Sequence, residues 1–241
     1  MNPYAIGLPA LAGLLLALAG PSCFGAPPSL DAHATGIFLN AGGDVLTARH
    51  AVQGCNALYV VKDARVVLAG VRATSPDHDL AVLSTTLTPY LSATFPIDMH
   101  AQPKGQGVFA ESYNVLRRMP DRAHVVFNAL SGPETGELSL LSPVQPGASG
   151  SPVLSAGLVL GMVVERLAPV QGSAASTSLS HVGRGVDVHG ASRVKAVSAE
   201  HVKEFLKENA IDFTLSDEPQ LGRMQAQAPR AATLSVGVIC D

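Results

Sequence analysis

Short apolar runs separated by turn residues set narrow limits on the fold of this chain. Each run is rich in Val and Leu and ends at Gly, Asn, Asp or Pro, which is the pattern of β-strands in an all-β lobe. In the first part of the chain we expect strands at residues 35–40, 45–52, 57–62, 65–72 and 79–85. The link NAGGD between the first two runs is typical of a β-hairpin.

A second set of runs predicts a second lobe of the same kind. The expected strands are residues 106–113, 123–130, 136–142, 151–155 and 157–167. Hydrophobic residues make up 47% of the chain but aromatic residues only 5%, so Val, Leu, Ile and Ala must build the core. Residues 88–105 carry three prolines and little periodicity, and they are expected to cross from one lobe to the other. The lobes should span about residues 30–90 and 104–197.

One helix is predicted, at residues 198–211 near the C-terminus. Ser198 is a suitable N-cap, Glu200 lies in the first turn, and apolar residues form one stripe. The stripe consists of Val202, Phe205, Leu206 and Ala210. We expect this helix to pack on the β body.

The residues after the helix are expected to form a C-terminal tail over 215–241. Residues 216–232 show no apolar period, which predicts a mobile segment. The last piece, TLSVGVICD, either adds a strand or remains loose.

The N-terminal residues 1–26 have the layout of a secretory signal peptide. Ala5 to Gly20 carry no charge, and small residues follow. A retained membrane anchor is the alternative, but sixteen residues fall short of the ~20 that span a bilayer. We therefore expect export to the periplasm or the medium, and contact with a membrane only through this segment if it is not cleaved.

Export bears on the three cysteines, because disulfides form in oxidising compartments. Loss of Cys23 with the signal leaves Cys55 and Cys240 as candidates for a disulfide. Two unpaired thiols are the alternative, since the sequence does not supply the Cα separation that a bridge requires.

The charge balance argues against a nucleic-acid partner. The chain has 16 Lys and Arg against 19 Asp and Glu, a net charge of -3, and so no surplus of basic residues for a phosphate backbone. Its histidines show no ligand spacing such as HExxH. We expect no metal and no cofactor.

The stretch PGASGSP places Ser149 between Gly147 and Gly150. A plain surface turn would explain these residues, as would a nucleophilic serine on a sharply bent backbone. A serine needs a nearby base, usually a histidine oriented by a carboxylate. His50 follows an expected strand and Asp79 opens another, although a core histidine and a capping aspartate are the alternatives.

Taken together, three segments resemble the chymotrypsin-type serine proteases, and among them the bacterial Deg or high-temperature-requirement group. The segments are GIFLNAGGDVLTARHAV, HDLAVL and PGASGSPV, and the likeness covers roughly residues 34–208. The resemblance implies an all-β fold of two perpendicular six-stranded antiparallel β-barrels, followed by the C-terminal helix. The trypsin-like peptidase domain would span residues 27–214.

The resemblance also implies roles for individual residues. Ser149 would attack the scissile carbonyl, His50 would accept its proton, and Asp79 would orient the imidazole. The backbone N–H groups of Gly147 and Ser149 would form the oxyanion hole.

By the same resemblance, Pro143 lies at the base of the substrate pocket. Its wall comes from residues 162–167, with Val163, Val164 and Glu165 as pocket residues. The base carries no acidic group, so small or aliphatic residues are expected at the cut site.

Two departures from the group qualify the resemblance. Ser151 stands where the group usually has glycine, a variant also found in glutamate-specific bacterial relatives. About thirty residues follow the helix, so we expect no PDZ domain. The sequence thus predicts a secreted or periplasmic serine endopeptidase that acts on proteins or peptides, while its oligomeric state is not predicted. The alternative is a catalytically silent binding or chaperone-like module on the protease fold.

Overall fold

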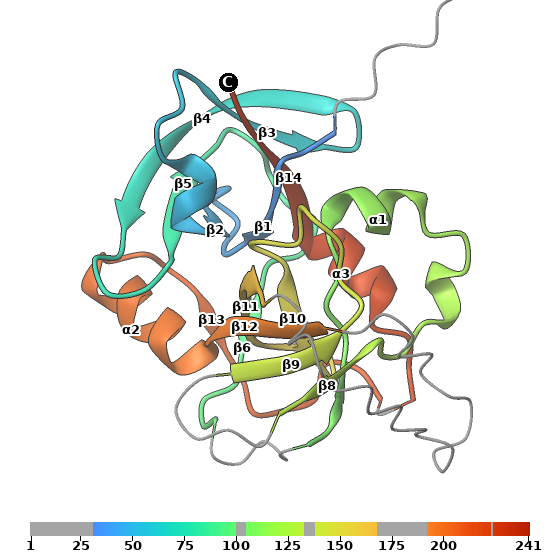
Figure 1. Cartoon of the computed structure of the whole chain (residues 1–241). Helices are drawn as coiled ribbons and strands as arrows, with labels where there is room; N and C mark the ends of the chain where they lie inside the picture. Colours follow the sequence, from blue (N-terminus) through green and yellow to red (C-terminus); the bar gives the residue numbers. More distant parts are fainter. Residues whose placement is uncertain (1–30, 100–104, 133–137, 168–191, 223) are drawn as a thin grey trace, which may run out of the picture. The chain divides into compact units, whose positions relative to one another are not determined.

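The computed structural model describes residues 31–99, 105–132, 138–167, 192–222 and 224–241. All of the described residues belong to one structural unit. This unit has two halves, whose positions relative to each other can therefore be described. The expected signal peptide at residues 1–26 lies outside the described residues. In Figure 1 the first barrel lies above the second, with α2 at the lower left and α1 and α3 at the right.

The first half is a closed six-stranded barrel in which every pair of neighbours is antiparallel. Its strand order is β1-β14-β3-β4-β5-β2. The strands are β1 (Ala34–Phe38), β2 (Val45–Thr47), β3 (Leu58–Lys62), β4 (Arg65–Thr74), β5 (Ala81–Ser84) and β14 (Ser235–Cys240). Four of these strands begin and end near the predicted runs, and the sixth comes from the C-terminus. β2 ends five residues before the end of its predicted run, because residues 49–52 form a 3-10 helix instead of a strand.

The C-terminal tail is a correction to the sequence prediction. Residues 228–240 form helix α3 (Ala228–Leu234) and strand β14, so the mobile tail predicted over 216–232 and the domain end at 214 are wrong there. The alternative of an added strand is right. β14 lies between β1 and β3, and it buries Val236 and Val238 in the core of the first barrel. β14 pairs with β1 and β3, which lie far away in the sequence. The only local sign of a strand here is the alternation of residues in SVGVI.

The second half is a six-stranded sheet with the order β10-β11-β12-β9-β8-β7. Its strands are β7 (Gly107–Val108), β8 (Ala129–Ser131), β9 (Leu138–Ser142), β10 (Pro152–Ser155), β11 (Leu158–Arg166) and β12 (Ser192–Ser198). Phe109, next to β7, and Leu154 in β10 exchange two backbone hydrogen bonds of 2.9 and 2.8 Å. This bridge joins the two end strands and makes the sheet barrel-like, so the predicted pair of six-stranded barrels is confirmed.

Two segments of the second half differ from the prediction. Helix α1 (Tyr113–Arg118) and the 3-10 helix η2 (Arg122–His124) occupy ends of the runs that were predicted as strands. Ser112 favours the start of α1, because its hydroxyl accepts a hydrogen bond from the N–H of Val115. β12 was not predicted, because the charged residues Arg193 and Lys195 lie between its buried residues and interrupt the apolar run.

The largest apolar cluster lies between the barrels and under the helices. Strand β1 contributes to it on one face with Ile37, while Phe38 on the other face fills the first barrel. All five residues of β1 are therefore buried. A strand buried on both faces shows no alternation of apolar and exposed polar residues, and the one polar residue of β1, Thr35, is also fully buried.

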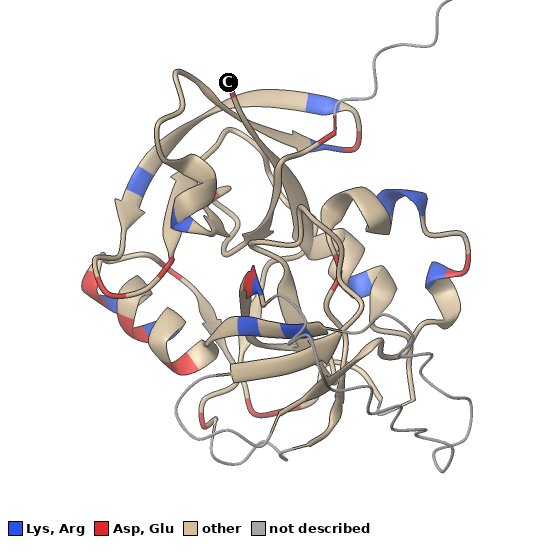
Figure 2. Cartoon of the chain, viewed as in Figure 1, with Lys and Arg blue, Asp and Glu red and all other residues tan. Residues whose placement is uncertain are grey.

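Helix α2 (Ala199–Glu208) agrees with the prediction at its start and ends three residues earlier than expected. Val202, Phe205 and Leu206 are buried, whereas Ala210 lies beyond the helix with a φ of 50°. Charged residues of both signs lie along α2 (Figure 2). Buried apolar residues on one side and mostly exposed charges on the other are typical of a helix that covers a core. Lys203 is the exception, because its side chain is buried and donates to the carbonyls of Pro96 and Ile97.

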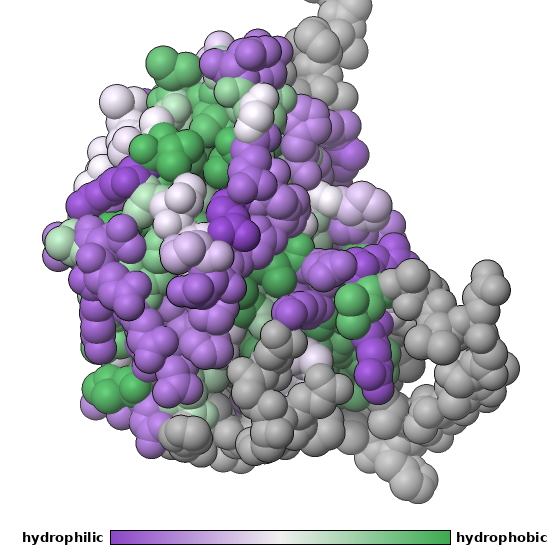
Figure 3. Space-filling model, turned by 60° about the vertical axis from the view of Figure 1, so that its left-hand side comes forward, coloured by the Kyte–Doolittle hydropathy of each residue, from purple (hydrophilic) through white to green (hydrophobic). Residues whose placement is uncertain are grey.

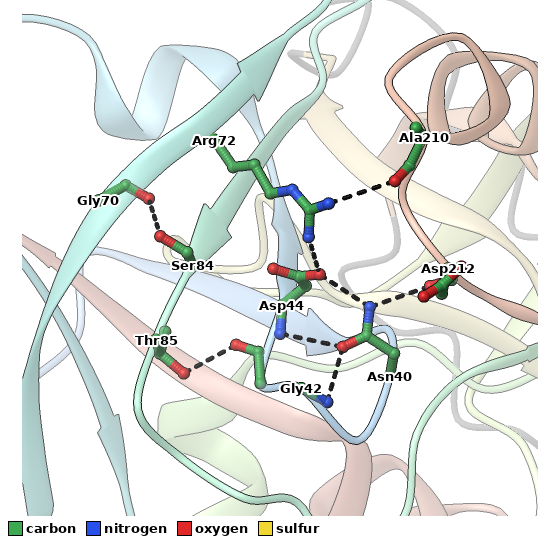
Figure 4. Close-up of polar contacts among 10 residues, drawn as sticks. Asn40, Gly42, Asp44, Gly70, Arg72, Ser84, Thr85, Ala210 and Asp212 are labelled. Carbon is green, nitrogen blue, oxygen red and sulfur yellow. Dashed lines mark hydrogen bonds and ion pairs between the residues drawn. The ribbon is translucent and has the colours of Figure 1, made fainter.

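Polar contacts fix the segment after α2 to the first barrel (Figure 4). Arg72 of β4 forms an ion pair with the buried carboxylate of Asp44 and also donates to the carbonyl of Ala210. The side-chain amide of Asn40 donates to Asp44 and to the carbonyl of Asp212. The hairpin between β1 and β2 is thereby connected to the end of the helix.

Apolar side chains are exposed on the upper part of the molecule, over the first barrel (Figure 3). β4 contributes Val66, Leu68 and Val71, of which Leu68 is 66% exposed. Its inward-facing residues Val67 and Ala69 pack against the barrel core. Among the described residues, no helix combines the length and the hydropathy needed to cross a bilayer.

Candidate active site

His50 and Asp79 are in direct contact on the first barrel. His50 belongs to the 3-10 helix η1 (Arg49–Val52), which follows β2, and Asp79 lies just before β5. The imidazole Nδ1 of His50 is 2.5 Å from Oδ2 of Asp79, and the backbone N–H of His50 donates to Oδ1 at 2.9 Å. Since β2 and β5 are paired in the barrel, their ends bring the two residues together.

Arg49 strengthens the connection between these two segments. Its guanidinium donates to the carbonyl of Ser75 and, at 3.1 Å, to that of Pro76, in the loop that leads to Asp79. The hydroxyl of Ser75 accepts a hydrogen bond from the N–H of His78 and so tightens the same loop. The sequence analysis did not identify Arg49, because a basic residue beside a histidine carries no signal of its own.

The contact with Asp79 determines which imidazole nitrogen is available for chemistry. An ionised carboxylate only accepts hydrogen bonds, so Nδ1 of His50 must carry the proton. In the neutral ring Nε2 then has a free lone pair and can accept a proton. The side chain of His50 is 51% exposed, so Nε2 is open to solvent and to a substrate. The pair has the arrangement of a general base with its orienting carboxylate.

His78 does not compete for this role. Its ring stacks on that of His201 in α2, with 4.3 Å between the ring centroids. It is partly buried against the helix. It therefore points to α2 and leaves Asp79 to His50.

Ser149 lies in a sharply bent loop at the edge of the second barrel. The loop enters and leaves the left-handed backbone region at Gly147 and Gly150, with φ values of 88° and 89°. Glycine adopts this conformation without the penalty that a Cβ atom brings. At Gly150 a Cβ would also lie 1.8 Å from the carbonyl oxygen of Thr35. Both glycines are thus required by the backbone.

The hydroxyl of Ser149 donates to the carbonyl oxygen of Val164 at 3.2 Å. In the described part of the chain no hydrogen bond joins this hydroxyl to His50. The N–H of Gly150 donates to Val163, and the N–H of Val163 donates to Ser151, so the loop is fixed to β11. The structure therefore brings His50 and Asp79 together and holds Ser149 on the neighbouring barrel.

Two backbone N–H groups of the loop are free for an incoming ligand. Neither the N–H of Gly147 nor that of Ser149 has an acceptor among the residues that the structure describes. By contrast, the N–H of Ala148 donates to the carbonyl of Gln145 at 3.2 Å. These are the two N–H groups that the sequence analysis assigned to the oxyanion hole.

A cavity of about 300 Å³ lies beside Asp79. Asp79 and His78 line it from the first barrel, Val164 and Glu165 from β11, and His201 from α2. Of the three candidate catalytic residues only Asp79 lines this cavity, and Ser149 is connected to it through the hydrogen bond of its hydroxyl to the carbonyl of Val164. Larger cavities of about 460 and 610 Å³ lie beside Lys62 and beside Phe127, and none of the three candidate catalytic residues lines them.

The predicted pocket residues are only partly in the expected place. Val164 and Glu165 line the cavity beside Asp79. The side chain of Val163 is buried in the core of the second barrel, so it does not form a pocket wall. Pro143 is partly buried and lies outside this cavity. Successive residues of a strand point to opposite sides, which explains why the side chains of Val163 and Val164 lie on different sides of β11.

Cys55 and Cys240 form a disulfide in the structure, with their Cα atoms 5.2 Å apart. It joins the end of β14 to the segment that follows η1, and η1 is the 3-10 helix that carries His50. The backbone of Asp241 pairs with Ala57 beside it. The covalent bond and the strand pairing together close the first barrel next to the candidate site.

Comparison with known proteins places this geometry in a family. The model of the family described as Trypsin-like peptidase domain matches residues 34–162, which is more than half of the chain. Uncharacterized protein y4bJ of Sinorhizobium fredii (strain NBRC 101917 / NGR234) is 25% identical over 214 residues, which cover 86% of this chain and 32% of that protein. The chain thus spans about a third of the length of this relative.

Solved structures with the same fold include two proteases. HtrA-type protease AlgW with a decapeptide has a TM-score of 0.51 and 17% identity, covering 74% of this chain and 51% of that one. An inactive form of Rv3671c from M. tuberculosis H37Rv has a TM-score of 0.51 and 18% identity, covering 73% and 81%. At these identities the likeness concerns the fold, and it agrees with the resemblance to the Deg group. From the family match and the shared double-barrel fold, the chain belongs to the trypsin-like peptidase family.

Proposed function

We propose that this chain is a serine endopeptidase that cleaves proteins or peptides through a His50-Asp79-Ser149 triad. The observation that carries the proposal is the double contact of His50 with Asp79, beside the cavity whose wall includes the acceptor of the Ser149 hydroxyl. This contact leaves Nε2 of His50 as the proton acceptor. A peptide as substrate also fits the decapeptide that accompanies AlgW.

Catalysis requires one local movement. Rotation about the Cα–Cβ bond takes the Ser149 hydroxyl from the carbonyl of Val164 toward Nε2 of His50. Such contacts are often loose in free enzymes and tighten when substrate binds. A substrate backbone that occupies the carbonyl of Val164 would displace the hydroxyl and favour the rotation.

The chemical step then follows from the groups present. The Ser149 oxygen bonds to the scissile carbonyl carbon while its proton passes to Nε2, and the carbonyl oxygen becomes an oxyanion facing the N–H groups of Gly147 and Ser149. The carbon–nitrogen bond breaks as His50 returns the proton to the leaving amine. Water, activated in the same way, releases the acyl group from Ser149. Loss of one oxyanion donor typically costs ~3 kcal/mol of transition-state stabilisation.

A second function has one observation in its favour. The hydroxyl of Ser149 is bonded to Val164 and not to His50, as expected of a catalytically silent binding or chaperone-like module. A fluorophosphonate probe separates the two functions, because it labels only an activated serine. We expect labelling that is lost in Ser149→Ala and retained in Ser151→Ala, a matched change two residues away. A folded protein that does not label would favour the binding module.

For substrate choice we propose small or aliphatic residues at the cut site. No acidic side chain is expected at the pocket base, and a buried substrate cation without a partner would be costly. Glu165 is exposed beside the Asp79 cavity and is the nearest acidic alternative. Cleavage of a peptide library should therefore concentrate after Ala, Val or Leu, and cleavage mainly after Lys, Arg or Glu would contradict this choice.

We also propose that the protein is exported after removal of residues 1–26. The uncharged N-terminal run and the pair of cysteines joined in the first barrel support this location. Mass analysis of the protein recovered outside the cytoplasm should give an N-terminus near residue 27. A full-length N-terminus in that fraction would indicate a retained anchor.

A further inference from the structure

Thr35 is a fully buried polar residue of β1 that forms hydrogen bonds across the boundary between the barrels. Its N–H donates to the carbonyl of Ser149 at 2.8 Å, and its hydroxyl donates to the carbonyl of Gly147 at 2.9 Å. Its hydroxyl also accepts from the N–H of Tyr113 at 2.9 Å, and its carbonyl accepts from the hydroxyl of Thr47 at 2.7 Å. Every polar atom of Thr35 is therefore engaged.

The direction of the hydroxyl bonds follows from their partners. The backbone N–H of Tyr113 can only donate, so Oγ1 of Thr35 accepts there. The carbonyl of Gly147 can only accept, so the hydroxyl proton of Thr35 points to it. One orientation satisfies both partners, and it fixes the hydroxyl on the loop that carries Ser149.

The two carbonyls that Thr35 binds belong to Gly147 and Ser149, the residues whose N–H groups form the proposed oxyanion hole. A hydrogen bond to the carbonyl of Gly147 fixes the plane of the peptide between Gly147 and Ala148. This peptide carries neither of the two N–H groups, but it is joined on each side to a peptide that carries one of them, so holding its plane restrains both. The N–H of Ala148 in the same plane donates to Gln145 within the loop. This peptide is therefore restrained by Gln145 from within the loop and by Thr35 from the first barrel.

Packing does not provide this restraint at Gly147. A Cβ built on Gly147 finds no atom nearer than 3.7 Å, whereas one built on Gly150 overlaps the backbone of Thr35. Gly147 combines open space with the wide conformational freedom of glycine. Its orientation therefore depends on hydrogen bonds, while that of Gly150 is set by close contact.

We infer that Thr35 is a positioning residue of the oxyanion hole, acting through the peptide that follows Gly147. The inference rests on the proposed function and adds a residue that touches neither substrate nor the reacting atoms. Its loss should weaken stabilisation of the transition state with little effect on binding of the uncleaved substrate. The serine would still be activated by His50, because Thr35 makes no contact with the imidazole.

The test compares Thr35→Val with Thr35→Ser and with Ser235→Ala in the full chain. Thr35→Val keeps the shape but removes the donor, and we expect kcat to fall about 10- to 100-fold with KM within about threefold. Thr35→Ser keeps the hydroxyl and should restore kcat to within a few fold. Ser235→Ala removes another fully buried hydroxyl of the same barrel, which has no hydrogen-bond partner among the described residues, and should retain kcat.

A peptide boronate provides a readout that a general loss of stability would not change. Its adduct with Ser149 places an oxygen in the oxyanion hole, so its affinity should fall in Thr35→Val by the same factor as kcat/KM. Affinity for an unreactive product peptide should stay the same. If Thr35→Val does not fold, Thr35→Cys, which offers a weaker donor, should show a smaller loss in both quantities.

The outcomes separate this inference from the proposed function. A wild-type protein that neither cleaves peptides nor binds the boronate overturns both. An active wild type with full boronate affinity in Thr35→Val, or with an equal loss in Ser235→Ala, overturns the role of Thr35 alone. Failure of Thr35→Ser to recover activity would also contradict it.

Discussion

The backbone N–H and the imidazole Nδ1 of His50 both bind the carboxylate of Asp79, each to a different oxygen, at 2.9 and 2.5 Å. The backbone contact fixes one carboxylate oxygen, so the carboxylate cannot turn away from the ring. The imidazole is thereby held with the proton on Nδ1 and the lone pair on Nε2. The orientation of the proposed base is a property of the first barrel alone.

Asp79→Asn should reduce kcat roughly 10⁴-fold without loss of the fold. The N–H of His50 would retain the amide oxygen, so the amide NH₂ would face Nδ1 and force the proton of the ring onto Nε2. The nitrogen nearest to Ser149 would then be unable to accept a proton. Steady-state kinetics on a cleavable peptide would measure the effect, with Asp121→Asn as an exposed control for the lost charge. A variant with a tenth of the wild-type kcat would contradict the proposed role.

Gly150→Ala should prevent folding or lower the free energy of unfolding by more than about 4 kcal/mol. The added Cβ would overlap the backbone of Thr35 at 1.8 Å, and backbone cannot move aside as a side chain can. Gly54→Ala is the matched control, since Gly54 has a φ of 75° and nothing within 4 Å of the new atom. It should cost only the strain of a left-handed residue, about 1–2 kcal/mol. Urea unfolding of both variants would decide, and equal costs would disprove the close contact.

Local patterns were sufficient to predict most strands, and the contact between His50 and Asp79 followed from the resemblance to the chymotrypsin-type proteases. The short Val-rich runs and their turn residues indicated the strands, and the ends of two such strands carry the pair. The position of β14 could not be predicted, because its partners β1 and β3 lie far away in sequence. Thr35 also escaped prediction, since a threonine in a strand is ordinary and its importance comes from atoms of another barrel. The face of the sheet to which the side chain of Val163 points depends on the strand register, and the sequence does not define this register.

Removal of the disulfide in Cys55→Ser/Cys240→Ser should lower the free energy of unfolding by about 2–5 kcal/mol. The bond closes a loop with a sequence separation of 185 residues, so it restricts the unfolded chain strongly. It also holds β14 in the barrel beside the segment that follows His50. Urea unfolding with and without reductant provides the measurement. The wild-type protein should lose stability on reduction and the double variant should not, whereas a wild type indifferent to reductant would show that the bond contributes nothing.

The buried carboxyl of Glu111 should make the protein less stable as the pH rises through the acidic range. Burial raises the pKa of Glu111, and the hydrogen bond from the N–H of Ser112 opposes this only in part. Between the ordinary carboxyl pKa of 4.5 and the higher pKa in the fold, the unfolded chain binds fewer protons than the folded protein. The free energy of unfolding therefore falls with pH across that window.

Glu111→Gln remains uncharged, so its free energy of unfolding should fall less between pH 4 and pH 8 than that of the wild type. The comparison uses the change with pH and not the absolute stability, because the new amide also faces the side chain of Asn128. Glu204→Gln, on the exposed side of α2, controls for the loss of one negative charge. Urea unfolding at pH 4, 6 and 8 would give the three curves. Parallel curves for the wild type and Glu111→Gln would mean that the carboxyl releases its proton equally well in the folded and unfolded states.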